Sequence, residues 1–141
     1  MNAPAFSTFS ALAELFVTIG VFYIVLHNRS RKGFAWLLAT VLIIFEFSVN
    51  MMYMIFRMRE TSGGAESVST VEPQMAVFMA GHGMLSLLVF MLLVVYSYLA
   101  FVAWKRGRYF FHEHPGVTWS FLGLWALSVG SGWALYFINY W

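Results

Sequence analysis

The sequence contains no cysteine among its 141 residues. Disulfides, iron–sulfur clusters, covalently attached c-type haem and thiolate nucleophiles all require that residue, so this chain supplies none of them. A metal ion or haem bound by this chain would have to be held by His, Met, Glu or Asn side chains. The lack of cysteine therefore narrows the possible cofactor chemistry before any motif is considered.

Charged residues are also scarce, at 10% of the chain, whereas 61% of the residues are hydrophobic. The mean hydropathy of +0.75 lies well outside the range of soluble globular proteins. The formal net charge is only +2. The sequence pI near 9.1 therefore reflects short basic loops, and we expect no nucleic-acid binding.

The few charges separate four apolar runs, each longer than the roughly 20 residues that cross a bilayer. The sequence predicts an all-α integral membrane protein, a single domain over 1–141 that forms a four-helix bundle. Its predicted spans are about 6–27, 34–56, 75–104 and 116–139, with a longer Gly- and Ser-rich loop over 57–73. The first run has no positive n-region of a cleavable signal peptide, so we expect it to be retained as a span.

The basic residues predict how the bundle is oriented, because cytoplasmic loops retain Lys and Arg. The two short turns carry the basic clusters, which are Arg29, Arg31 and Lys32, and Lys105, Arg106 and Arg108. The longer loop instead sets Arg59 against three glutamates. We therefore expect both termini outside and a multi-pass protein of the inner (cytoplasmic) membrane.

Polar residues within the predicted spans are costly in lipid and need an explanation. At about 1.5 Å rise per residue, Glu14, Glu46, Asn50 and His82 all fall in the outer half of the membrane. One interpretation is that they only hydrogen-bond to one another and hold the bundle in register. The other is that they form a functional site. The sequence has no catalytic triad, phosphate-binding glycine loop or HExxH motif, so we do not expect an enzyme.

Most of the methionines lie in the same outer half, in the stretches 51–58 and 75–84, and recur at helical spacings of three and four. Thioether and imidazole groups select Cu(I) over harder ions, which favours a copper site. Its predicted ligands are His82, Met75, Met79, Met51 and Met54. The competing interpretation is that methionine only fills gaps in apolar packing. Packing alone does not explain His82.

The other three histidines, His27, His112 and His114, lie near the basic turns at the inner edge. One interpretation is that they are interfacial residues beside lipid headgroups. The alternative is a cofactor site, because His27 with His112 or His114 can supply the two imidazoles of a b-type haem at similar depth. The sequence favours copper over haem, since His82 has no imidazole partner at its own depth.

The C-terminal half has a pattern of a loop histidine, His114, followed by Trp125, Ser131-Gly132 and Tyr136. With Gly81-His82-Gly83-Met84 near the start of the third span, it resembles the YozB-like membrane proteins, the domain of unknown function numbered 420. The likeness covers most of the chain in layout and about the last 60 residues in motifs. The residues that match by position are His82, His114, Trp125, Gly132 and Tyr136.

The chain departs from that family at several positions. Lys32 and the Met51 to Met58 cluster stand where relatives tend to carry histidines, and Ser131 replaces the usual Thr. A metal site built on those histidines in relatives would be lost or rebuilt here. The resemblance implies a four-span fold and, from members in Gram-positive bacteria, a link to the assembly of haem–copper terminal oxidases.

Together these observations predict a non-catalytic membrane protein that supports a respiratory complex of the haem–copper oxidase type as an assembly or accessory factor. Its expected partners are the lipid bilayer and other membrane subunits of that complex. Two alternatives stay open. One is a permanent accessory subunit of a large membrane oxidoreductase, and the other is a redox subunit that binds b-type haem or quinone.

Overall fold

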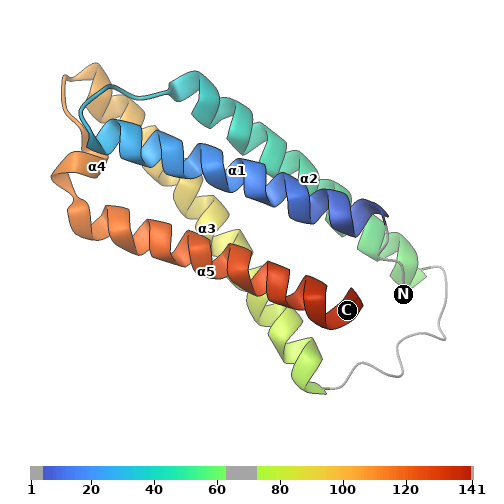
Figure 1. Ribbon diagram of the computed structural model, residues 1–141. Coiled ribbons are helices and arrows are strands. Elements are labelled where there is room, and N and C mark those ends of the chain that lie inside the picture. The colour runs from blue at the N-terminus through green and yellow to red at the C-terminus, as the bar shows by residue number, and fades with distance from the viewer. Residues whose placement is uncertain (1–4, 63–72, 141) are drawn as a thin grey trace.

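The computed structural model describes the backbone of residues 5–62 and 73–140, with side chains at 8–55, 58, 59 and 73–138 (Figure 1). Its helices are α1 (Ala5–Arg29), α2 (Trp36–Ser62), α3 (Pro73–Lys105), α4 (Phe110–Glu113) and α5 (Pro115–Tyr140). The described residues contain no strand. Four of the helices are long and apolar enough to cross a membrane. The predicted all-α four-span fold is confirmed, whereas the compartment that each end faces stays a prediction.

The second helix differs from its predicted bounds at both ends. It begins at Trp36, two residues late, because Gly33 has a φ of 120° and the chain turns there. It continues to Ser62, beyond the predicted end at 56, because Arg, Met and Glu follow the apolar run and favour a helix. The predicted loop is therefore shorter at that end, and its Gly- and Ser-rich part, 63–72, lies outside the described residues.

The short helix α4 was not predicted from the sequence. It follows a turn in which Gly107 has a φ of 72°, and it ends directly before Pro115, the first residue of α5. Proline is well suited to the first helical position because its N–H would have no partner there. The last two spans are therefore joined by a folded connection, which packs on α1, α3 and α5.

The four long helices form a bundle in which α1 and α3 each pack on both α2 and α5. The two short turns and α4 lie at one end, whereas α1 begins and α5 ends toward the other (Figure 1). The most deeply buried side chains, including Val21, Ile24 and Phe121, gather toward the end with the short turns. Glu14, Glu46 and His82 lie farther from that end.

Helix α5 carries two pairs of small residues four positions apart, Ser128 with Gly132 and Ala126 with Gly130, and only one pair lies where other helices approach closely. Ser128 is buried, and Gly132 faces side chains of both α1 and α3. Ala126 and Gly130 are exposed, and a Cβ at Gly130 would meet nothing within 4 Å. Residues two positions apart differ by about 200° around a helix, so the two pairs cannot share one face. Of these four residues, only Ser128 and Gly132 bring helices of this chain together.

Candidate functional site

Polar side chains from all four long helices lie in one layer of the bundle: Glu14 on α1, Glu46 on α2, His82 on α3 and Ser131 on α5. Two of them approach the same point on α5. A Cβ added to Gly132 would lie 3.3 Å from Oε2 of Glu14 and 3.4 Å from Nε2 of His82. Because glycine has no side chain, the carboxyl group of Glu14 and the imidazole of His82 can both approach α5 at this position.

The orientation of His82 follows from its hydrogen bond to Ser131. Nδ1 of His82 lies 2.8 Å from the Ser131 hydroxyl oxygen, which itself donates to the carbonyl of Ser128 at 2.8 Å. Because the hydroxyl hydrogen is already used, the imidazole must donate from Nδ1. Nε2 of the neutral ring then carries a lone pair, and it is the nitrogen on the side of Gly132 and Glu14. The site therefore presents a nitrogen acceptor or metal ligand beside a carboxyl group.

The second carboxyl group of the layer comes from α2. Oε1 of Glu46 accepts a hydrogen bond of 3.2 Å from Nδ2 of Asn50, which also donates to the Glu46 carbonyl at 2.9 Å. Glu14 lies close enough to Glu46 for the two to repel each other electrostatically when both are ionised. Because like charges in a low-dielectric bundle repel each other, a proton or a cation shared by the two carboxyl groups would reduce this repulsion.

Two further hydrogen bonds fix α1 against α5 on either side of Glu14. The Thr18 hydroxyl donates to the Glu14 carbonyl at 2.7 Å and accepts from Nε1 of Trp125 at 3.1 Å. Nearer the helix start, Thr8 shares a hydrogen bond of 3.0 Å with the Tyr136 hydroxyl. The turn that carries Glu14 is therefore held directly by α5. Thr18 was missed from the sequence, and its only signal is its place four residues after Glu14.

The predicted copper ligands lie on two surfaces of different exposure. Met75 and Met79 are half-buried on the α3 face that also carries His82. Met51 and Met54 on α2 are 46% and 59% exposed. Among the described residues, no group of three or more His, Asp or Glu side chains is arranged to hold a metal ion. A soft-metal site here would depend on the α3 residues rather than on α2.

The three histidines near the short turns, His27, His112 and His114, each have a local partner. His112 donates from Nδ1 to the Arg29 carbonyl at 3.0 Å and accepts at Nε2 from the Arg31 guanidinium at 2.7 Å. His114 donates from Nδ1 to the Phe110 carbonyl at 2.9 Å, and His27 stacks on a tyrosine ring. None of the described hydrogen bonds or ring contacts pairs two of these histidines. Both nitrogens of His112 are used to fasten α4 to the turn after α1.

A buried asparagine strengthens the contact between α4 and the turn after α1, and it was also missed from the sequence. Asn28 is fully buried, and its Nδ2 donates to the Gly33 carbonyl at 3.2 Å. Its Oδ1 accepts from the Phe111 N–H at 3.1 Å. One amide side chain thus satisfies backbone groups of two separate connections. The end of the bundle with the short turns is a structural clamp, and the polar layer remains the candidate site.

No family model, curated protein or solved structure matches this chain. The resemblance to the YozB-like proteins therefore rests on the residues quoted above. Four of those residues make contacts between helices: His82 and Gly132 at the polar layer, Trp125 with Thr18, and Tyr136 with Thr8.

Proposed function

We propose that this chain is a non-catalytic membrane protein that supports a respiratory complex of the haem–copper oxidase type, as an assembly or accessory factor. The observation that carries the proposal is the meeting of Glu14 and His82 at Gly132 within an apolar bundle. Ionisable groups at such depth are costly, and they commonly mark ion, proton or ligand sites. The resemblance to the YozB-like family supplies the kind of partner.

The copper part of the proposal rests on His82 and its own helix. Nε2 of the imidazole has a free lone pair, because Nδ1 donates to Ser131. The thioethers of Met75 and Met79 lie on the same half-buried face of α3. Nitrogen and thioether sulfur are ligands that Cu(I) accepts. Met51 and Met54 are exposed on α2 and are left out of this site.

The orientation proposed for the protein puts this layer on the outer side of an inner membrane. The turns beside α4 carry the two basic clusters, and such clusters are retained in the cytoplasm. The polar layer lies toward the opposite end, where α1 begins and α5 ends. Both termini would then face outward, on the side where a respiratory oxidase receives its copper.

Purification of the full chain from native membranes in mild detergent tests the proposal. We expect subunits of a haem–copper oxidase to copurify in less than stoichiometric amount, as for a factor that acts during assembly. Copper per chain should fall in His82→Ala and stay unchanged in His114→Ala, a matched substitution at an exposed histidine outside the layer. Unchanged copper in His82→Ala would remove the copper site from the proposal.

Two other outcomes would favour the alternative functions. Stoichiometric copurification with a stable oxidoreductase, without bound metal in this chain, would make it a permanent accessory subunit. A b-type Soret band in the purified, separated chain would make it a redox subunit. If no subunit of a respiratory complex copurifies with the chain, the proposed role is contradicted.

A further inference from the structure

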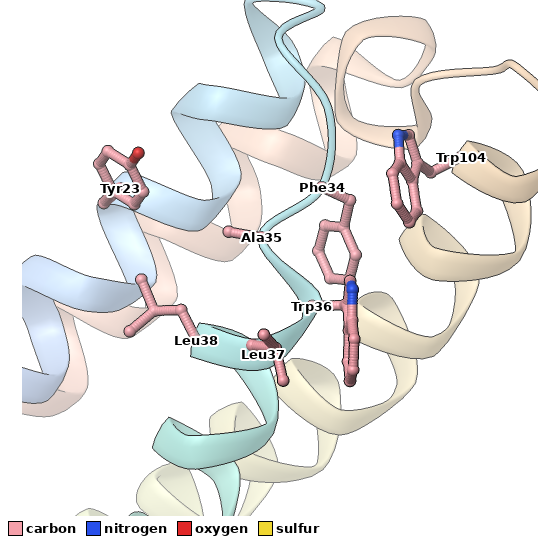
Figure 2. A pocket seen from close by; sticks show the side chains of 7 residues that line it. All are labelled: Tyr23, Phe34, Ala35, Trp36, Leu37, Leu38 and Trp104. Carbon is pink, nitrogen blue, oxygen red and sulfur yellow. The ribbon is translucent and has the colours of Figure 1, made fainter.

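A shallow apolar groove of about 390 Å³ lies at the basic end of the bundle, where α1, the start of α2 and the end of α3 meet (Figure 2). Its lining consists of four aromatic and three aliphatic residues: Tyr23, Phe34, Trp36, Trp104, Ala35, Leu37 and Leu38. Trp36 is 44% exposed, so the groove opens sideways from the bundle. A cavity of this kind at the end of the spans lies where lipid headgroups meet acyl chains.

Two hydrogen-bond donors at this groove lack partners. Neither Nε1 of Trp36 nor Nε1 of Trp104 donates to any group in the described part of the chain. Both indole nitrogens point toward the turn between α1 and α2 (Figure 2). A Cβ on Gly33 of that turn would lie 3.7 Å from Nε1 of Trp104. The groove therefore offers two indole N–H groups that can donate to ester or phosphate oxygens.

Two lysines adjoin lining residues of the groove in sequence, Lys32 before Phe34 and Lys105 after Trp104. Nζ of Lys105 lies 5.4 Å from the Phe101 ring, which in turn contacts the rings of Trp36 and Trp104. Lys32 is exposed directly before the turn that leads into the groove. In residues 26–36 and 103–116, all of them described, the one acidic residue is Glu113, which is paired with Arg108. Lys32 and Lys105 are therefore left without carboxylate partners in these two stretches.

From these three observations we propose that the groove binds one anionic phospholipid. An acyl chain lies along the aromatic and aliphatic lining, and the headgroup phosphate lies among the two indole N–H groups and the two lysines. The net charge selects an anionic headgroup over a zwitterionic one, because each nearby Lys contributes about 1 kcal/mol, or about fivefold in affinity. This inference is independent of the polar layer and of the proposed respiratory role.

Native mass spectrometry of the full chain, with added dioleoyl-phosphatidylglycerol or dioleoyl-phosphatidylcholine, tests the inference. We expect one molecule of the anionic lipid to bind several-fold more tightly than the zwitterionic lipid. The double variant Lys32→Gln/Lys105→Gln should lower that affinity by about 25-fold. Trp36→Phe keeps an aromatic ring but removes one N–H donor, and should lower it by about fivefold. Arg59→Gln, at the opposite end of the bundle, should leave it unchanged.

Each contrary result overturns the inference. Equal binding of the two lipids would show that charge does not select the occupant. Full retention of lipid by the double lysine variant, or an equal loss in Arg59→Gln, would show that binding is not localised to this groove. Displacement of the lipid by excess inorganic phosphate would show a simple anion site without a contribution from the acyl chain. Because both lysines are exposed, we expect the double variant to fold normally. A thermal unfolding curve that matches the curve of the unmodified chain checks this.

Discussion

The imidazole of His82 on α3 and the hydroxyl group of Ser131 on α5 are joined by a hydrogen bond of 2.8 Å. Because Ser131 donates onward to the Ser128 carbonyl, this bond fixes both the ring orientation and its tautomer. The free nitrogen then lies on the side of Gly132 and Glu14. A single hydroxyl group thus determines which atom of His82 the polar layer can use.

Replacing Ser131 tests this relationship. In Ser131→Ala the imidazole loses its acceptor at Nδ1, so we expect the ring to populate both tautomers. Ser131→Thr is the matched control, because it keeps a hydroxyl group at the same place and should preserve the Nδ1–H form. The ¹⁵N chemical shifts of His82 report the tautomer directly. Identical spectra for the Ala variant and the unmodified chain would contradict the assignment.

Gly132→Ala tests the space between Glu14 and His82. Its Cβ would lie 3.0 Å from Cε1 of His82, so the imidazole must move or the helices must separate. We expect a loss of about 1–3 kcal/mol in the free energy of unfolding, as for other overpacked sites. Unfolding of the variant and of the unmodified chain in mixed detergent measures this difference in free energy.

Gly130→Ala is the control, because a Cβ there meets nothing within 4 Å. The substitution should be neutral or slightly stabilising, since Ala favours a helix more than Gly does. Equal changes in the free energy of unfolding for Gly132→Ala and Gly130→Ala would mean that close packing at Gly132 does not exclude a side chain.

Composition predicted the spans well because lipid leaves few alternatives to a helix. The apolar runs and the position of the basic turns are sufficient to locate all four long helices. The four-residue helix α4 could not be found in this way, since it is too short to show a period of 3.6. Its position depends on Gly107 and on the contact of Phe111 with buried Asn28.

The polar layer was only partly predictable, because helices that are apolar all round do not reveal which face is buried. Depth along the helix is fixed by sequence, and it put Glu14, Glu46 and His82 at one level. Rotation about each helix axis is set by packing between helices. For that reason the sequence could not separate the half-buried Met79 from the exposed Met54, or identify Thr18 as the partner of Trp125.

Asn28→Ala tests the clamp at the end of the bundle with the short turns. The substitution removes the acceptor of the buried Phe111 N–H and the donor to the Gly33 carbonyl. A buried group left without a partner costs about 1–3 kcal/mol, so we expect a loss of that size in the free energy of unfolding. Amide hydrogen exchange at Phe111 should also become faster.

Asn50→Ala is a matched control for the clamp, because the described bonds of Asn50 reach only Glu46, one turn away on the same helix. It should cost less than Asn28→Ala and leave exchange at Phe111 unchanged. A stable Asn28→Ala variant with slow exchange at Phe111 would show that the asparagine does not join the two connections.

The ion pair between Arg108 and Glu113 lies outside the spans and should give the connection between α3 and α5 a measurable pH dependence. The guanidinium donates from Nε at 3.2 Å and from Nη2 at 2.6 Å to the two carboxylate oxygens. These hydrogen bonds and the positive charge hold the pKa of Glu113 below its ordinary value. NMR titration of the Glu113 carboxyl carbon should therefore show a lowered midpoint, which Arg108→Gln returns toward the ordinary one.

The sign of the effect on stability follows from the lowered pKa. The folded state holds the carboxylate more firmly than the unfolded state, so the contribution is complete above the ordinary pKa of Glu and disappears as the pH falls through the lowered one. Glu113→Gln should therefore differ in unfolding from the unmodified chain at neutral pH but not in strong acid. The difference should be small, because the Arg108 side chain is 65% exposed. Arg108→Lys keeps the charge but loses the two-donor geometry, so a fully lowered midpoint in that variant would mean that charge alone, without the paired hydrogen bonds, shifts the titration.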